Sequence, residues 1–257
     1  MCALKKMKGM KVFMNNDILA LKEKLDKIKN LGWIECENKN KSVTGKTLEN
    51  LLEINPDNFE IPDYNTVEIK SKVSKRENYI DLFCATPDSY VLETKRLYDK
   101  YGYLDNNNYK ILNFVLYGEF LKPINNEYSA RLRIDYKNKK VIMEVYNKDN
   151  ELIDNLSSWS FELLEEKLCR KLNYVCLVEG DKKFSHNTLY VRYDKYKFYK
   201  LKKFSDFIQL LKRGQIRISF TLGIYKSGSK SGKMHDHGTQ FSIRKENMKL
   251  LFDEIEL

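Results

Sequence analysis

Residues 62–70 of the chain read Pro62-Asp63-Tyr64-Asn65-Thr66-Val67-Glu68-Ile69-Lys70, and they place two carboxylates and a lysine around the start of a predicted strand. Apolar and polar residues alternate from residue 66 to residue 72, which is typical of a strand and puts Glu68 and Lys70 on one face. Proline favours turns and the first residue of a strand. We therefore expect Asp63 at the edge of the same sheet, where the strand begins.

These residue types predict a metal site. Asp63 and Glu68 offer hard oxygen ligands, and the Ile69 carbonyl lies next to them in the sequence. Such ligands suit Mg²⁺, which keeps several of its waters. Lys70 would supply a fixed positive charge beside one of those waters, which is the equipment for hydrolysing a phosphodiester. The alternative is an exposed strand face with an ordinary Glu–Lys pair.

A third carboxylate precedes this stretch. Glu49 lies in TLENLLE, residues 47–53, where leucines recur on one side and predict a short helix. At the site, Glu49 would bind a second Mg²⁺ or order the water shell of the first. A solvent-facing helix glutamate is the alternative.

Composition indicates a folded intracellular protein. The chain has 257 residues, of which 42% are hydrophobic and 12% aromatic, so it can bury a core. No apolar run is long enough to span a membrane, and lysines interrupt the N-terminus too often for a signal peptide. We expect a cytoplasmic location without membrane contact. The five scattered cysteines predict reduced thiols.

Positive charge is concentrated in one part of the chain. Residues 182–233 contain 14 lysines and arginines but only two aspartates, a local balance of +12 within a total of +10. The rest of the chain therefore sums to about −2. Aromatic residues and lysines alternate over residues 193–200 of the same window. This pattern favours a nucleic acid as the partner over a carbohydrate or a lipid surface.

Hydrophobic periodicity predicts an α/β (α+β) fold with a mixed central sheet flanked by helices. The predicted helices cover residues 17–30, 47–53, 90–101, 204–211 and 246–254, with one more opening at residue 160. The predicted strands cover residues 66–72, 79–85, 109–117, 130–136, 140–146, 174–180 and 216–225. We expect strand 79–85 to pair with strand 66–72, and residues 37–46 to form a loop. A polar stretch near residue 150 separates an expected catalytic lobe, residues 1–150, from a basic DNA-recognition lobe, residues 151–257.

Two of the three histidines, His235 and His237, lie two residues apart beside a Gly/Ser/Lys-rich loop at residues 227–233. On a strand they would share a face, which allows a zinc half-site. Contact with guanine edges in a DNA groove fits the neighbouring basic loop better. A purely structural role is the third alternative.

The run TGKTLENLLEI…IPDYNTVEIKSK resembles the catalytic core of the MutH-like branch of PD-(D/E)XK endonucleases. The order and spacing of Glu49, Asp63, Glu68 and Lys70 are most similar to restriction endonucleases of the MvaI/BcnI type. A later run, GKMHDHGTQF at residues 232–241, is similar to the family's histidine–glycine segment, which reads bases. The chain departs from the family near residue 242, where it carries serine, with the arginine at position 244.

The resemblance implies Mg²⁺-dependent cleavage of double-stranded DNA at a short, CCNGG-like site by a monomer. One or two ions would be bound by Asp63, Glu68 and Ile69, with Glu49 and Lys70 completing the catalytic residues. A cognate DNA methyltransferase would be a functional partner. The expected DNA contacts are Lys197, Lys200, Lys202, Arg217, Lys230, Lys233, His235, His237 and Arg244. The alternatives are a MutH-like nicking endonuclease of mismatch repair and an inactive DNA-binding relative.

Overall fold

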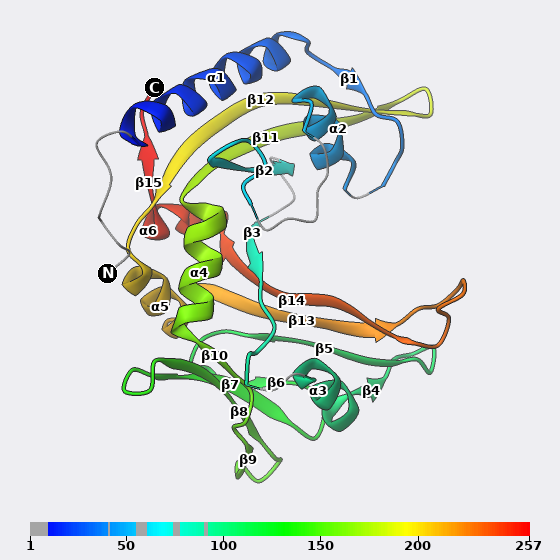
Figure 1. The fold of residues 1–257 in the computed structure, drawn as a ribbon. Helices are drawn as coiled ribbons and strands as arrows, with labels where there is room; N and C mark the ends of the chain where they lie inside the picture. Colours follow the sequence, from blue (N-terminus) through cyan, green and yellow to red (C-terminus); the bar gives the residue numbers. More distant parts are fainter. Residues whose placement is uncertain (1–9, 41, 55–60, 74–77, 90–91) are drawn as a thin grey trace. The chain divides into compact units, whose positions relative to one another are not determined.

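The structure is a computed structural model that describes residues 10–40, 42–54, 61–73, 78–89 and 92–257, with side chains from residue 16 onward (Figure 1). Contacts divide the chain into two compact units. Unit 1 comprises Met1–Ile80, Cys169–Lys202 and Phe252–Leu257, and unit 2 comprises Asp81–Leu168 and Lys203–Leu251. The units are interleaved along the sequence. The predicted catalytic and DNA-recognition lobes, residues 1–150 and 151–257, are a division by function and not by contacts. That division stays a prediction.

Unit 1 is built on a mixed sheet. Its strand order is β1-β12-β11-β2, with β15 pairing β12. The strands are β1 (Ile34–Glu35), β2 (Val67–Val73), β11 (Tyr174–Ser185), β12 (Thr188–Leu201) and β15 (Phe252–Ile255). β2 and β11 run parallel, whereas the other pairs are antiparallel. Among the described strands, β2 therefore has one hydrogen-bonded neighbour in the sheet, β11.

The expected pairing of strand 79–85 with strand 66–72 is wrong. β3 (Tyr79–Cys84) belongs to another sheet, where it neighbours β14. The partner of β2 is β11, and Val67 is aligned with Tyr174. Parallel pairing needs a long crossover, and residues 74–173 provide it. β11 also begins with five buried residues, as expected of a strand in the interior of a sheet.

Two helices build the core of unit 1 with this sheet. α1 (Met10–Asn30) runs beside β12, and α2 (Val43–Leu51) lies near β11 and β2 (Figure 1). The apolar stripe of α1 is buried together with residues of α2 and of the sheet. Its members are Ile18, Leu21, Leu25 and Ile28, which confirms the helix predicted for residues 17–30. α2 begins at Val43, inside the stretch that we expected to be a loop.

Unit 2 contains two five-stranded sheets, apart from the first two residues of β3, which belong to unit 1. One has the order β3-β14-β13-β5-β4, and the other has the order β10-β8-β7-β6 with β9 on β8. The strands are β4 (Tyr103–Leu104), β5 (Lys110–Leu116), β6 (Lys122–Pro123), β7 (Ser129–Asp135), β8 (Lys140–Tyr146), β9 (Leu152–Asp154), β10 (Ser158–Ser160), β13 (Ile216–Ile224) and β14 (Met234–Arg244). The helices are α3 (Glu93–Tyr101), α5 (Phe204–Lys212), α6 (Met248–Leu251) and the first part of α4 (Phe161–Leu172). The predicted hairpin of β7 and β8 is confirmed.

The helix predicted for residues 246–254 is wrong at its C-terminal end, where residues 252–254 form a strand. A 3₁₀ turn, η1 (Lys245–Asn247), and the four-residue α6 are followed by strand β15. β15 pairs with β12 and buries Phe252. Strand pairing and the burial of Phe252 override the helix preference of Glu254 here.

The fold is the mixed α+β arrangement that the periodicity predicted. None of the described helices is both long enough and apolar enough to cross a membrane. Four cysteines are free thiols, namely Cys36, Cys84, Cys169 and Cys176. Cys2 lies outside the described residues.

Candidate active site

The four predicted catalytic residues all lie in unit 1. Glu49 is on α2, Asp63 precedes β2, and Glu68 and Lys70 are on β2 itself. The Lys70 Nζ donates a hydrogen bond of 2.7 Å to Glu68 Oε1. Glu68 and Lys70 therefore share a strand face, as the alternation predicted.

A tight turn folds Asp63 back onto β2. The backbone groups of Tyr64 and Val67 bond reciprocally, with N···O distances of 3.0 and 2.7 Å. Asn65 takes a positive φ of 48° between them, a conformation that asparagine tolerates better than most residues. Asp63 Oδ2 then accepts a 2.9 Å hydrogen bond from the Ile69 N–H. The turn thus fixes one carboxylate against the strand that carries the other.

The carboxylates influence one another electrostatically. Glu68 is buried, with 1% of its surface exposed. Burial raises the pKa of Glu68, and the charge of Asp63 raises it further, whereas Lys70 opposes both. Burial also raises the pKa of Glu49, again with a contribution from the charge of Asp63. Asp63 therefore lies within electrostatic reach of both other carboxylates.

The two oxygens of Glu68 have different environments. Oε1 contacts Lys70, whereas Oε2 is buried and has no hydrogen-bond partner among the described residues. Buried polar atoms usually have a partner. An unpartnered carboxylate oxygen close to the charge of Asp63 is therefore suited to bind a hard cation. The described residues contain no group of three or more His, Cys, Asp or Glu side chains that could hold a metal by themselves. Mg²⁺ commonly uses one or two carboxylates and keeps its waters, and Asp63 with Glu68 fits that pattern.

Sequence reasoning missed a second lysine at the site. Lys171, in the last turn of α4, places its Nζ 3.4 Å from Glu68 Oε1. α4 leads directly into β11, and β11 begins beside the start of β2, because Tyr174 is aligned with Val67. Only the parallel pairing of β2 with β11 would have revealed Lys171. The local pattern around residue 171 carries no such signal.

Two of the three DNA contacts predicted on unit 1 are already ion-paired. Lys197 contacts Glu254 at 2.6 Å, and Lys202 lies 3.6 Å from Asp253, both acids being on β15. Lys200 is exposed on β12. The basic window of residues 182–233 is itself divided, because residues 182–202 belong to unit 1 and residues 203–233 to unit 2. The alternation expected over residues 193–200 is present, with buried or half-buried aromatic residues between exposed lysines.

The other predicted DNA contacts lie on unit 2, on or beside the hairpin of β13 and β14. The rings of His235 and His237 have centroids 4.0 Å apart, which confirms that they share a face. Tyr225 stacks on His235 at 4.1 Å, and Lys230 lies 5.6 Å from the centroid of Tyr225. Arg217 is on β13, Lys233 is exposed in the hairpin loop, and Arg244 is exposed and contacts Glu246. The described residues place no further metal ligand beside the histidine pair, so a zinc half-site gains no support.

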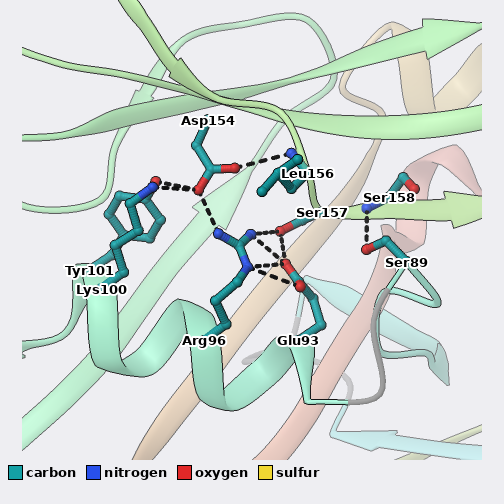
Figure 2. Close-up of polar contacts among 9 residues, drawn as sticks. All are labelled: Ser89, Glu93, Arg96, Lys100, Tyr101, Asp154, Leu156, Ser157 and Ser158. Carbon is teal, nitrogen blue, oxygen red and sulfur yellow. Dashed lines mark hydrogen bonds and ion pairs between the residues drawn. The ribbon is translucent and has the colours of Figure 1, made fainter.

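A second cluster of buried carboxylates, in unit 2, has a different character (Figure 2). Arg96 of α3 bonds Glu93 and also reaches Asp154 at 2.6 Å. Ser157 contacts Glu93 and accepts a hydrogen bond from Arg96. Tyr101 donates a 2.7 Å bond to Asp154. These carboxylates are satisfied by their neighbours, so the cluster joins α3 to the end of β9 and to the residues that follow it.

Comparison with known proteins identifies the class. The sequence model of the MvaI/BcnI restriction endonuclease family matches residues 22–252. The solved structure "Restriction endonuclease MvaI-cognate DNA substrate complex" is similar with a TM-score of 0.85 and 30% identity, over 92% of this chain and 96% of that chain. "Restriction endonuclease MvaI in the absence of DNA" is similar with a TM-score of 0.60 and 27% identity, over 93% and 96%. No curated protein matches the sequence.

The fold and these matches define a type II restriction endonuclease, a site-specific deoxyribonuclease that acts on DNA. The chain belongs to the MvaI/BcnI restriction endonuclease family, which confirms the resemblance seen in its sequence.

Proposed function

We propose that this restriction endonuclease cleaves double-stranded DNA at a short, CCNGG-like site with Mg²⁺ held by Asp63 and Glu68. The observation that carries the proposal is the bare, buried Oε2 of Glu68, because both lysines contact the other oxygen, Oε1. The Ile69 N–H faces Asp63. A strand residue directs its N–H and its C=O to the same edge, so the Ile69 carbonyl is available as a further ligand.

Each residue then has a distinct task. When bound, Mg²⁺ lowers the pKa of a water and polarises the phosphate. Asp63 and Glu68 provide the negative charge that holds the ion. Lys70 stabilises the negative charge that develops on the phosphate. Glu49 orders the surrounding water or assists a second ion.

Lys171 complements Lys70 in this arrangement. Lys70 bonds Glu68 in the structure but has to reach the phosphate during cleavage. Lys171 already lies near the same oxygen and keeps Glu68 charged and oriented when Lys70 turns away. A buried carboxylate without a cationic partner is costly. Because two lysines contact the same oxygen, Lys70 can act on the substrate while Lys171 stays with Glu68.

The similar MvaI structure contains cognate DNA, which supports double-stranded DNA as the substrate. The phosphate contacts proposed are Lys197, Lys200, Lys202, Arg217, Lys230 and Lys233, and the base contacts proposed are His235, His237 and Arg244. The family resemblance further implies that the enzyme works as a monomer in the cytoplasm beside a cognate methyltransferase.

A digest of phage DNA with the purified protein tests the proposed substrate. We expect fragments in Mg²⁺ but not in EDTA, and sequenced ends that share one short site. Random ends would overturn site-specific cleavage of this kind. Single-strand nicks that depend on a partner protein would favour the MutH-like alternative, and binding without cutting would favour an inactive relative.

A further inference from the structure

The N-terminal helix contacts the turn that carries the metal-binding aspartate. Asp17, on α1, accepts a 3.0 Å hydrogen bond from the Asn65 side-chain amide through Oδ1. Its Oδ2 accepts a 2.8 Å bond from the Thr66 hydroxyl. Both central residues of the turn between Asp63 and Glu68 are therefore tied to a single carboxylate from a distant segment.

This turn sets the separation of the two proposed metal ligands. Its own backbone holds it through the reciprocal bonds of Tyr64 and Val67. Asn65 has a positive φ, which costs conformational energy in any residue with a side chain. Contacts from outside the turn stabilise such a conformation, and Asp17 provides two of them.

The same helix reaches the segment that carries Glu49. Lys24 lies 5.4 Å from the centroid of the Tyr64 ring, at the start of the turn. Its Nζ also lies 3.5 Å from the carbonyl of Leu52, directly after the end of α2. Between these polar contacts, the apolar stripe of α1 is buried against α2 and β2. One helix thus contacts both segments that bring carboxylates to the site.

We propose that Asp17 is a positioning residue of the nuclease, which holds the Asn65–Thr66 turn so that Asp63 and Glu68 bind one cation together. The inference rests on the proposed role of Asp63. Asp17 touches neither substrate nor metal, and it acts through the turn. Loss of its carboxylate would leave the backbone bonds of the turn in place but would allow Asp63 to move relative to β2.

We expect loss of the Asp17 carboxylate to disturb the geometry of the metal site and to leave DNA binding unchanged. A displacement of about 1 Å in a catalytic constellation can cost about a hundredfold in rate. The turn keeps its backbone bonds, so we expect Asp17→Ala to slow single-turnover cleavage about tenfold and to raise the Mg²⁺ concentration for half-maximal rate about tenfold. Asp17→Asn, which keeps one acceptor oxygen, should lie between Asp17→Ala and the wild type. DNA binding in Ca²⁺ should stay near the wild-type level at saturating metal.

Asp26→Asn is the matched control, because Asp26 lies on the same helix and also bonds neighbours, namely Lys22 and Tyr196. We expect this variant to show wild-type Mg²⁺ dependence. Thr66→Val removes one of the two donors, and its effect should not add to that of Asp17→Ala, because both break the same contact.

The outcomes separate the two proposals. A wild-type Mg²⁺ dependence of Asp17→Ala, or an equal shift in Asp26→Asn, would overturn the positioning role while leaving the function of the site intact. Full additivity with Thr66→Val would also contradict it. Cleavage by Asp63→Ala would instead overturn the proposed function itself.

Discussion

At the scale of single residues, the site depends on how the two oxygens of Glu68 are used. Oε1 lies 2.7 Å from Lys70 and 3.4 Å from Lys171, whereas Oε2 has no hydrogen-bond partner in the part of the chain that the structure describes. A carboxylate that is buried to this extent is stable as an anion only with cations nearby. The lysines and the proposed metal together meet that requirement, and each can be tested separately.

Lys171→Ala should slow cleavage by about tenfold or more, because Glu68 then loses a cation that persists when Lys70 contacts the phosphate. Lys171→Arg retains the charge and should recover most of the rate. Single-turnover rates at saturating Mg²⁺ measure the effect. Equal rates for Lys171→Ala and the wild type would show that Lys171 has no part in cleavage.

At the scale of elements, the cluster around Arg96 ties α3 to the end of β9 and to the residues that follow it (Figure 2). The side chains of Glu93 and Asp154 are 1% and 2% exposed, so removal of the arginine takes from buried Glu93 its cationic partner and leaves buried Asp154 with Lys100. We expect Arg96→Met to lower the free energy of unfolding by about 3 kcal/mol. Lys95→Met is the control, because its pair with Asp99 is exposed on the same helix and contributes little. Chemical denaturation measures both, and equal effects would contradict the role of burial.

The same cluster predicts a pH dependence of stability. Burial alone would raise the pKa of Asp154, but hydrogen bonds from Arg96, Tyr101 and Lys100 outweigh it and hold that pKa far below its ordinary value of 3.8. The folded state therefore binds the proton less tightly than the unfolded state. The resulting stabilisation is present above pH 3.8 and is lost as the pH falls through the acid range.

Thermal unfolding between pH 7 and pH 2 tests this dependence. Asp154→Asn should be less stable at pH 7 and should lose less stability on acidification than the wild type. Parallel stability curves for the two proteins would show that Asp154 does not contribute to the acid sensitivity.

Local patterns predicted those elements whose contacts are close in sequence. The stripe Ile18, Leu21, Leu25 and Ile28 predicted α1, and the alternation around Glu68 predicted β2. The same alternation placed Glu68 and Lys70 on one face, which the 2.7 Å contact confirms. The sequence pattern cannot specify which strands pair across long crossovers. The partner of β2, the strand β15 and the approach of Lys171 and Asp17 all depend on such long-range contacts.

At the scale of the whole molecule, the positive charge is spread over both units rather than confined to one. Lys197 and Lys202 are paired with acids of β15, which reduces the field that they present to solvent. Exposed Lys200 lies between them on β12. The charge of Lys200 is therefore less screened toward a bound polyanion than the charges of Lys197 and Lys202.

Lys200→Ala should weaken DNA binding equally for specific and unrelated sequences. It should also reduce the slope of log affinity against log salt by about one, because one phosphate contact is lost. Binding titrations in Ca²⁺ at several salt concentrations measure the slope. A slope identical to that of the wild type would exclude a phosphate contact at this position.

The most direct measurement is plasmid cleavage by the wild type and by Asp63→Ala, with DNA binding in Ca²⁺ measured beside it. We expect the wild type to linearise unmethylated plasmid in Mg²⁺, and the variant to leave it supercoiled while retaining most of its DNA binding. Cleavage by Asp63→Ala at the wild-type rate would contradict the assignment of the catalytic centre to Glu49, Asp63, Glu68 and Lys70.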